Sequence, residues 1–497
     1  MEDLSARLDT ALKALVDDQE FSEIPDVALY ADVQDQWHKG YREALERSIL
    51  EGDYGPRHTE IVDYPKNAIS VRPLARFSAR DRLIYDSLVF DLAEEVDRHR
   101  HQSVYSYRWN HKTGALIFWS YSWKLMRRNA LRTLKRNHRF HMATLDVSSF
   151  YEHIDVELLS EDLGIMVSNE LAVSRVSVFL RKFQNINHAW GLPQGSDASG
   201  ILANAYLASV DQFLSRNRIP FFRYSDDISV FDESWNSLRD VLVDVNKIFR
   251  ARKLSMAGHK TGIVDYDTAY DRLKNARESS IDHAVFVGDP EVVHEIRDYF
   301  DEICEEPEID IRRLKYALNK LRRQGDDYAV SWCLNNLRYI AHVSKEIFAY
   351  FAVCGHRLPE IRRKLTDFMH SSASPSYPYI EQRILRYFIR MNEESEYMKE
   401  AAWNILYDRN REEFPREFAA RYLGRCASVA ESQLLRHEFE REPSEAMRRA
   451  LLLALYESAY LSERYRRDVH HSFPGLKWLC AYLEQNPKVP TSREEMR

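Results

Sequence analysis

Two adjacent carboxylates interrupt an otherwise aromatic and β-branched stretch of this chain, FRYSDDISVF at residues 222–231. The alternation on either side of Asp226 and Asp227 predicts two short strands joined by a tight turn. Neighbouring anions repel each other and lose hydration in a half-buried strand, so they need a compensating cation. The stretch therefore predicts a cation-binding hairpin or, if the pair only caps an exposed turn, an ordinary surface loop.

The length of the chain and the spread of its apolar residues limit the class of protein. With 497 residues, 44% of them hydrophobic, the chain is too long for one typical core and should form two or more domains. No apolar run approaches the roughly 20 residues that span a bilayer, and the first residues, MEDLSARLDT, are polar and acidic. We therefore expect a soluble, intracellular protein with no membrane partner.

One segment is strongly basic although the formal net charge of the chain is -7. No Asp or Glu occurs from Arg98 to Leu145, where basic residues alternate with aromatic ones such as Tyr107 and Trp119. Such a mixture suits a groove that follows a phosphate backbone and stacks bases; a solvated helix face is the alternative. Spacings of three and four residues place most of the basic residues on one face of a helix. The candidate nucleic-acid contacts are Arg108, Lys124, Arg128, Arg132, Lys135 and Arg139.

Secondary-structure signals along the chain predict an α+β region followed by an all-α region. Residues 1–60 read as an N-terminal helical extension, and residues 61–290 combine short strands with helices. HMATLDVSSFY predicts a strand that ends in a turn, and HAVFVGDP predicts another strand closed by Gly288 and Pro290.

Residues 291–497 lack strand signals. They contain amphipathic segments of about 12 to 16 residues separated by short polar or proline-containing breaks, for example EIRRKLTDFMH and EAMRRALLLALYE. Helix pairs of this length with short connections predict a HEAT-like α-solenoid, which usually offers a surface to a partner. A compact helical bundle is the alternative.

A third carboxylate, Asp146, ends the apolar run of HMATLD. If this strand lies beside the hairpin, Asp146, Asp226 and Asp227 meet and supply the hard oxygen ligands that two Mg²⁺ ions require. Two such ions, about 3.5 to 4 Å apart, activate an attacking hydroxyl and stabilise a pyrophosphate leaving group. Taken alone the pattern is weak, because turns favour Asp for other reasons.

Four blocks in a fixed order make the pattern specific, and together they resemble the reverse transcriptases. The blocks are LDVSSFY at 145–151, GLPQGSDASG at 191–200, YSDD at 224–227 and AGHKTGIV at 257–264. Upstream, YPKNAISVRPLARFSARDRLIYDSLV resembles the fingers segment of group II intron and retron enzymes. The resemblance covers roughly residues 60–290. It implies the fingers and palm of a right-hand polymerase, an RNA-directed DNA polymerase that takes dNTPs and uses Mg²⁺, with Mn²⁺ as an alternative.

The resemblance also implies catalytic roles for individual residues. Asp146, Asp226 and Asp227, together with Val147, would hold the metal ions. Lys260, in the block after the YSDD box, would donate a proton to the departing pyrophosphate.

Other matched positions imply contacts with the substrates. Tyr151 falls where these enzymes place an aromatic steric gate, whose ring excludes a ribose 2′-hydroxyl. Lys66 and Arg72 would reach the triphosphate from the fingers, and Gln194 would lie against the incoming nucleotide and the template. VFVG, which ends at Gly288, is similar to a primer-grip strand.

The C-terminal region narrows the resemblance to one group. The chain shows no ribonuclease H pattern, no His-Asn-His endonuclease motif and no CxxC zinc cluster, and helical patterns follow the palm directly. This organisation resembles the abortive-infection and related defence-associated reverse transcriptases of bacteria, of the AbiK and phage P2-associated type. It implies a cytoplasmic homo-oligomer, a trimer or a hexamer, that acts against phage. Its DNA product would be primed by a tyrosine of the protein and would be untemplated or copied from a non-coding RNA.

Two other functions stay open. A retron-like enzyme would copy a dedicated RNA. A catalytically idle scaffold would bind a partner through the solenoid and use the palm only to sense nucleotides, although three intact carboxylates favour an enzyme. Candidates for a priming tyrosine precede the fingers and are Tyr30, Tyr41, Tyr54 and Tyr64.

Overall fold

The computed structural model describes residues 2–492 except residues 20–21, 58, 188–190 and 355–357. The chain forms two compact units, the first from residues 1–15, 43–61 and 73–280 and the second from residues 16–42, 62–72 and 281–497. An α+β region followed by an all-helical region confirms the fold class expected from the sequence. The units differ from the expected boundaries, because parts of residues 1–60 and of the fingers segment group with the C-terminal helices.

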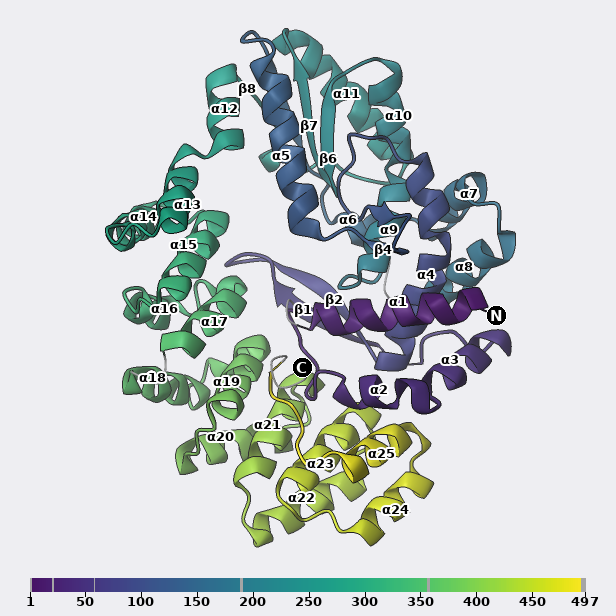
Figure 1. The fold of residues 1–497 in the computed structure, drawn as a ribbon, viewed down its shortest axis with the longest axis vertical. Coiled ribbons are helices and arrows are strands. Elements are labelled where there is room, and N and C mark those ends of the chain that lie inside the picture. The colour runs from purple at the N-terminus through teal and green to yellow at the C-terminus, as the bar shows by residue number, and fades with distance from the viewer. Residues whose placement is uncertain (1, 20–21, 58, 188–190, 355–357, 493–497) are drawn as a thin grey trace. The chain divides into compact units, whose positions relative to one another are not determined.

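The centre of the first unit is an antiparallel sheet of four strands in the order β6-β7-β5-β8 (Figure 1). The expected hairpin around the two carboxylates is formed by β6 and β7. The strands are β5 (His141–Leu145), β6 (Phe221–Tyr224), β7 (Asp227–Asp232) and β8 (Gly262–Val264).

The other elements that lie wholly or partly in the first unit are mainly helices. They are α1 (Glu2–Asp18), α3 (Tyr41–Leu50), β1 (Thr59–Pro65), β2 (Val71–Phe77), α4 (Ala79–His99), β3 (Trp109–Asn110), β4 (Ala115–Leu116), α5 (Trp119–Lys135), α6 (Phe150–His153), α7 (Val156–Met166), α8 (Glu170–Asn187), α9 (Asp197–Tyr206), α10 (Ala208–Arg216), α11 (Trp235–Ala251), η2 (Gly258–Lys260), α12 (Tyr266–Lys274) and α13 (Ala276–Val287).

Both faces of the central sheet carry buried apolar side chains. Met142, Phe222 and Phe231 share one face and pack in a cluster with α5 and α12. Ile228 and Val230, which alternate with these positions along β7, are also buried, and α11 contacts β5, β7 and β8. Burial on both faces holds the sheet edge that carries the acidic turn on a rigid support.

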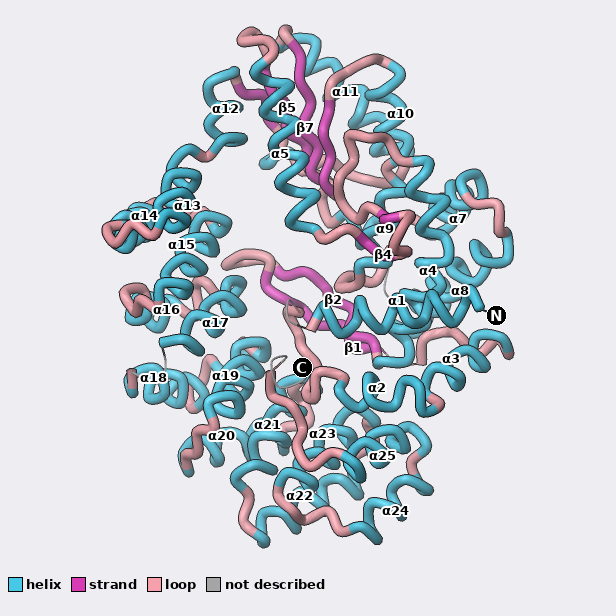
Figure 2. The backbone as a smooth tube through the Cα atoms, in the orientation of Figure 1, coloured by secondary structure: helices cyan, strands magenta, loops and turns pink. Residues whose placement is uncertain are grey.

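The second unit is built almost entirely from helices (Figure 2). Their bounds are α2 (Ala31–Gln36), η1 (Trp37–Lys39), α14 (Val292–Glu305), α15 (Ile311–Gln324), α16 (Val330–Asn336), η3 (Ala341–Val343), α17 (Ser344–Cys354), α18 (Pro359–Met369), η5 (Ser374–Ser376), α19 (Pro378–Met391), α20 (Glu396–Tyr407), α21 (Glu413–Cys426), α22 (Val429–Arg441), α23 (Glu445–Glu457), α24 (Glu463–Ser472), η6 (Pro474–Leu476) and α25 (Lys477–Gln485).

Helices α14 to α23 are arranged as a solenoid rather than as a closed bundle. Contacts join α15, α17, α19, α21 and α23 in one row, and α16, α18 and α20 in a second row. Two rows of alternate helices result when helix pairs stack one after another. The HEAT-like organisation expected from the short connections is therefore confirmed.

A buried ion cluster attaches α2 and the segment before it to the solenoid. Arg449 of α23 contacts Asp26 and Asp32, with an N–O distance of 2.6 Å to each carboxylate. Arg449 holds the pKa of Asp26 below its ordinary value, although burial alone would raise it. This contact explains why residues 16–42 group with the C-terminal helices.

One expectation from the sequence is wrong. HAVFVGDP does not form a strand, because residues Ala276–Val287 form helix α13. A short apolar run does not distinguish a strand from a helix by itself, and here Ala, Arg and Glu at its start favour a helix. Phe286 and Val287 are exposed rather than paired in a sheet, so VFVG is not a primer-grip strand in this structure.

None of the helices in the described part of the chain has both the length and the apolar character needed to cross a membrane.

Candidate active site

The three expected carboxylates meet at one edge of the central sheet. Leu145 of β5 lies opposite Ile228 of β7, so the next antiparallel position brings Asp146 beside Asp227. Asp226 occupies the turn between β6 and β7, where Ser225 adopts a positive φ of 57°. Val147, the fourth expected ligand, is buried and forms an isolated bridge with Met256.

The electrostatics of the carboxylates show that they are close enough to affect one another. Burial, followed by the negative charge of Asp146, raises the pKa of Asp226. Desolvation of the carboxylate and the charges of Asp226 and Asp146 raise the pKa of Asp227 to about 7, although the residue as a whole is accessible to solvent. Such crowding destabilises the ionised forms unless a cation is present.

Lys260 provides one positive charge at this edge. The Ala257 N–H donates to the backbone oxygen of Asp146 at 2.8 Å, which places η2 beside the end of β5. The Lys260 ammonium lies 2.8 Å from Asp146 Oδ2. Burial lowers the pKa of Lys260, but the hydrogen bond and charge of Asp146 outweigh burial and raise it.

The donor set fits divalent cations in its chemistry. Carboxylate oxygens are the ligands that Mg²⁺ and Mn²⁺ prefer, and burial together with the neighbouring carboxylates raises the pKa values of Asp226 and Asp227. Among the described residues, no three or more His, Cys, Asp or Glu side chains form a ready-made metal site. Asp146 is instead paired with Lys260, so its carboxylate would exchange this partner for a metal ion.

A buried polar network that the sequence did not reveal supports the acidic turn. Arg223 of β6 is fully buried and donates through Nε to Asp211 Oδ1 at 2.8 Å. Its Nη1 donates to the Ser225 oxygen at 2.8 Å and to Asn204 Oδ1 at 2.7 Å. A charged side chain inside a run of buried strand residues, FFRY, was the available signal.

Tyr151 of α6 and the loop at residues 191–195 are joined through the backbone. The Leu192 N–H donates to the Tyr151 oxygen at 2.8 Å. Gly191 has φ of +73°, and a Cβ there would lie 1.9 Å from the same oxygen, so only glycine fits. The oxygen of Gln194 accepts from the Ala75 N–H at 2.9 Å, which ties this loop to β2.

Lys66 and Arg72 belong to the second unit, whereas the three carboxylates belong to the first. Lys66 is exposed near the turn between β1 and β2, where its N–H donates to the Ser70 oxygen at 2.8 Å. Arg72 forms an ion pair with Glu23, and its guanidinium lies over the Tyr64 ring. Their contact with a triphosphate stays a prediction, and for Arg72 it requires release from Glu23.

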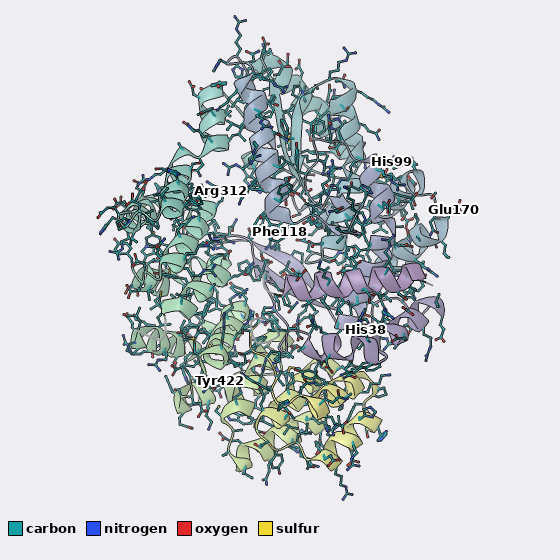
Figure 3. The ribbon with its side chains drawn as sticks, in the orientation of Figure 1. His38, His99, Phe118, Glu170, Arg312 and Tyr422 are labelled. Atoms are coloured by element: carbon teal, nitrogen blue, oxygen red, sulfur yellow. The ribbon has the colours of Figure 1, made fainter. Side chains whose placement is uncertain are left out.

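Helix α5 carries most of the expected nucleic-acid contacts on one exposed face. Its buried positions, Met126, Ala130 and Leu134, pack toward the sheet. Phe118, at the N-cap and labelled in Figure 3, and Trp119 are 56% and 55% exposed. The expected contacts that are exposed here are Lys124, Arg128, Arg132 and Lys135, followed by Arg139 in the next loop; Arg136 is exposed as well.

Arg108 differs from the other basic candidates. Its Nη1 lies 3.5 Å from Asp97 Oδ1 of α4, so its charge is partly compensated within the protein.

Comparison with known proteins identifies the region that contains this site. Residues 64–281 match the family model described as reverse transcriptase (RNA-dependent DNA polymerase), over less than half of the chain. No curated protein shows a significant match to the sequence.

Similar solved structures include two telomerases. Telomerase from Candida albicans, in complex with a TWJ fragment of telomeric RNA, has 11% identity and a TM-score of 0.30 over 73% of this chain and 70% of that chain. Apo telomerase from Candida tropicalis has 12% identity and a TM-score of 0.28 over 77% and 74%. Scores this low do not establish a common overall fold.

Proposed function

We propose that this chain, an RNA-directed DNA polymerase by its reverse transcriptase domain, adds dNTPs to a DNA strand at Asp146, Asp226 and Asp227. The observation that supports this site is the antiparallel register of β5 and β7, which brings Asp146 beside Asp227. Bound divalent ions, Mg²⁺ or alternatively Mn²⁺, supply charge that activates the 3′-hydroxyl and stabilises pyrophosphate.

The residues around the carboxylates have separate roles in this proposal. Lys260 leaves Asp146 and donates a proton from Nζ to the departing pyrophosphate. Tyr151 excludes the ribose 2′-hydroxyl, and Gln194 lies against the incoming nucleotide. Lys66 and Arg72 bind the triphosphate through their positive charges.

The exposed basic face of α5 binds nucleic acid in this proposal. Lys124, Arg128 and Arg132 follow one another at intervals of four residues and are all exposed. Phe118 and Trp119 expose their rings at the start of this row of positive charges. Such a surface suits a phosphate backbone with unstacked bases.

We further propose that the enzyme is a bacterial, cytoplasmic homo-oligomer, a trimer or a hexamer, that acts in abortive infection against phage. The support is the resemblance of the reverse transcriptase blocks followed directly by a helical solenoid. Synthesis would be primed by a tyrosine and would be untemplated or copied from a non-coding RNA. Of the four candidates, Tyr41 and Tyr64 are buried, which favours Tyr30 and Tyr54.

The central experiment incubates purified full-length protein with dNTPs and Mg²⁺ or Mn²⁺. We expect DNA synthesis by the wild type and none by the double variant Asp226→Ala, Asp227→Ala. Asp232→Asn is the matched control, because Asp232 ends the same strand and accepts from the Ser234 N–H at 2.8 Å, outside the site. Synthesis by the double variant at the wild-type rate would contradict the proposed site.

Whether the DNA product is attached to protein, attached to RNA or free distinguishes protein priming from a retron-like enzyme. DNA that stays on the protein after denaturation and is released by protease supports protein priming. Free or RNA-linked DNA with a defined complementary sequence favours a retron-like enzyme. Protection of cells from phage by the double aspartate variant would instead favour a scaffold without catalysis.

A further inference from the structure

The segment Ser103–Tyr107 joins the acidic turn to helix α9 and lies outside the four sequence blocks that define the site. Val104 forms a parallel bridge with Arg223 of β6. The Arg223 N–H donates to the Ser103 oxygen at 2.9 Å, and the Tyr105 N–H donates to the Arg223 oxygen at 3.0 Å. Ser106 Oγ then accepts from the Ser225 N–H at 2.8 Å. The segment therefore runs along β6 to the turn that carries Asp226.

Tyr107, the last residue of this segment, is held in one place by its backbone and its ring. Its φ is +47°, a conformation that is uncommon for a residue other than glycine and is kept only where the surroundings enforce it. Its backbone oxygen accepts from Arg100 Nη1 at 2.8 Å. The ring lies flat on Gly200 of α9, because a Cβ at Gly200 would lie 2.3 to 2.4 Å from three ring carbons.

The hydroxyl of Tyr107 faces the residue proposed to select the sugar. Tyr151 Oη and Tyr107 Oη are 3.5 Å apart, at the long end of hydrogen-bond distances. The proximity of Tyr151, followed by burial, raises the pKa of Tyr107, and burial is the main cause that raises the pKa of Tyr151. Both hydroxyls therefore stay protonated and able to donate at neutral pH.

We propose that Tyr107 is a positioning residue that holds the Tyr151 ring and thereby sets how strongly the enzyme prefers dNTPs to rNTPs. This inference rests on the proposed function, in which Tyr151 excludes the 2′-hydroxyl. A gate of this kind discriminates only if its ring cannot turn away when a ribose enters. Tyr107, fixed by Gly200 and by its own backbone, limits that movement of Tyr151.

The test compares kcat/KM for a dNTP with kcat/KM for the matching rNTP. Tyr107→Phe removes the hydroxyl and keeps the ring, and we expect it to lower the dNTP to rNTP ratio about 2- to 10-fold, the effect of one neutral hydrogen bond. Gly200→Ala displaces the ring and should lower the ratio further. Loss of folded protein lowers the rates with the dNTP and with the rNTP alike. If Tyr107 only stabilised the fold, its replacement would therefore leave the dNTP to rNTP ratio unchanged.

Tyr105→Phe is the matched control. Tyr105 lies two residues away, and its hydroxyl accepts from Asn129 Nδ2 of α5 at 2.8 Å rather than facing Tyr151. This variant should keep the wild-type ratio. An equal fall of the ratio in Tyr105→Phe and Tyr107→Phe would overturn the inference.

Two further outcomes are decisive. If Tyr107→Phe makes DNA with the wild-type ratio while Tyr151→Ala loses discrimination, the proposed function stands and the role of Tyr107 is refuted. If the wild-type protein makes no DNA, the proposed function itself fails. Should Gly200→Ala not fold, Tyr107→Phe decides alone.

Discussion

The ammonium of Lys260 and the carboxylate of Asp146 are 2.8 Å apart and form an ion pair at the end of β5. The Lys260 side chain is 44% exposed, whereas the Asp146 side chain is 8% exposed. An ion pair of which one partner is largely solvated is weak, so Lys260 is released at low cost when another cation approaches. The carboxylate is thus partly neutralised without a metal ion and is available to one.

Replacing Lys260 with Gln should strengthen metal binding and weaken catalysis. Without the competing ammonium, we expect Mn²⁺ to bind about 2- to 5-fold more tightly, which corresponds to roughly 0.5–1 kcal/mol. DNA synthesis should fall because the proposed proton donor is lost. Electron paramagnetic resonance of free Mn²⁺ measures the affinity without nucleotide. Lys253→Gln, which alters the ion pair with Asp155, is the control; an unchanged Mn²⁺ affinity in Lys260→Gln would contradict the competition.

Gly191→Ala should destabilise the first unit and stop synthesis. A Cβ at residue 191 would lie 1.9 Å from the Tyr151 oxygen, and φ is +73°, so both contact and backbone are strained. We expect a loss of about 2–4 kcal/mol in the free energy of unfolding, measured with urea. Gly164→Ala is the opposite case, because Gly164 lies in α7 and a Cβ there would have no atom within 4 Å. This variant should gain up to about 1 kcal/mol in the free energy of unfolding.

Breaking the Arg223–Asp211 pair from one side should cost more than removing both charges. Their side chains are 0% and 5% exposed, so Arg223→Met leaves a buried, unpaired carboxylate and should lose about 3–5 kcal/mol. The double variant Arg223→Met, Asp211→Leu should recover part of that loss in urea unfolding. Synthesis should stay low in both, because the hydrogen bond to the Ser225 oxygen is gone. Full activity of the double variant would show that the turn holds its position without Arg223.

The basic face of α5 should determine how nucleic-acid affinity depends on salt. Neutralising Lys124, Arg128 and Arg132 with Gln should lower affinity for single-stranded DNA. The negative slope of log K against log salt should become shallower by about 2. Arg175→Gln, on α8, is a control of the same charge change. A salt slope equal to that of the wild type in the triple variant would identify this face as an ordinary solvated helix surface.

The sequence predicted the site where local patterns and motif order agree, and it missed the contacts that link distant residues. The meeting of Asp146, Asp226 and Asp227 was predicted because local patterns put Asp146 at the end of a strand and the other two at a hairpin turn, and the order of the four blocks made the pattern specific. Arg72 was expected to be available for a triphosphate, but it pairs with Glu23, 49 residues away, and no local pattern reveals such a partner. Helix α13 was missed because its apolar run also suits a strand.

Tyr107 and Arg223 show two different reasons for a missed role. Arg223 carried a signal, since an arginine between two phenylalanines and a tyrosine in a strand is unusual and needs a buried partner. No local pattern indicated a positioning role for Tyr107, because its aromatic neighbours suggested base stacking instead. Its position depends on Gly200, 93 residues later, and on a positive φ that only the folded chain enforces.

Glu431 of α22 should make the stability of the solenoid depend on pH in the acid range. Its carboxylate accepts from the Ser428 N–H at 2.7 Å and lies 3.0 Å from Lys399 Nζ. Burial opposes ionisation, but the Ser428 and Lys399 contacts outweigh burial and lower the pKa of Glu431 from 4.5 to about 2. Because the pKa is lower in the folded state, the ionised carboxylate stabilises the folded protein above pH 4.5, and this stabilisation is lost as the pH falls from about 4.5 to about 2.

The variant Glu431→Gln should therefore lose about 1–2 kcal/mol in the free energy of unfolding at pH 7 and match the stability of the wild type near pH 2. Glu440→Gln, which removes an exposed pair with Arg436 on the same helix, should show no such convergence; a difference for Glu431→Gln that persists at pH 2 would contradict the ionic origin.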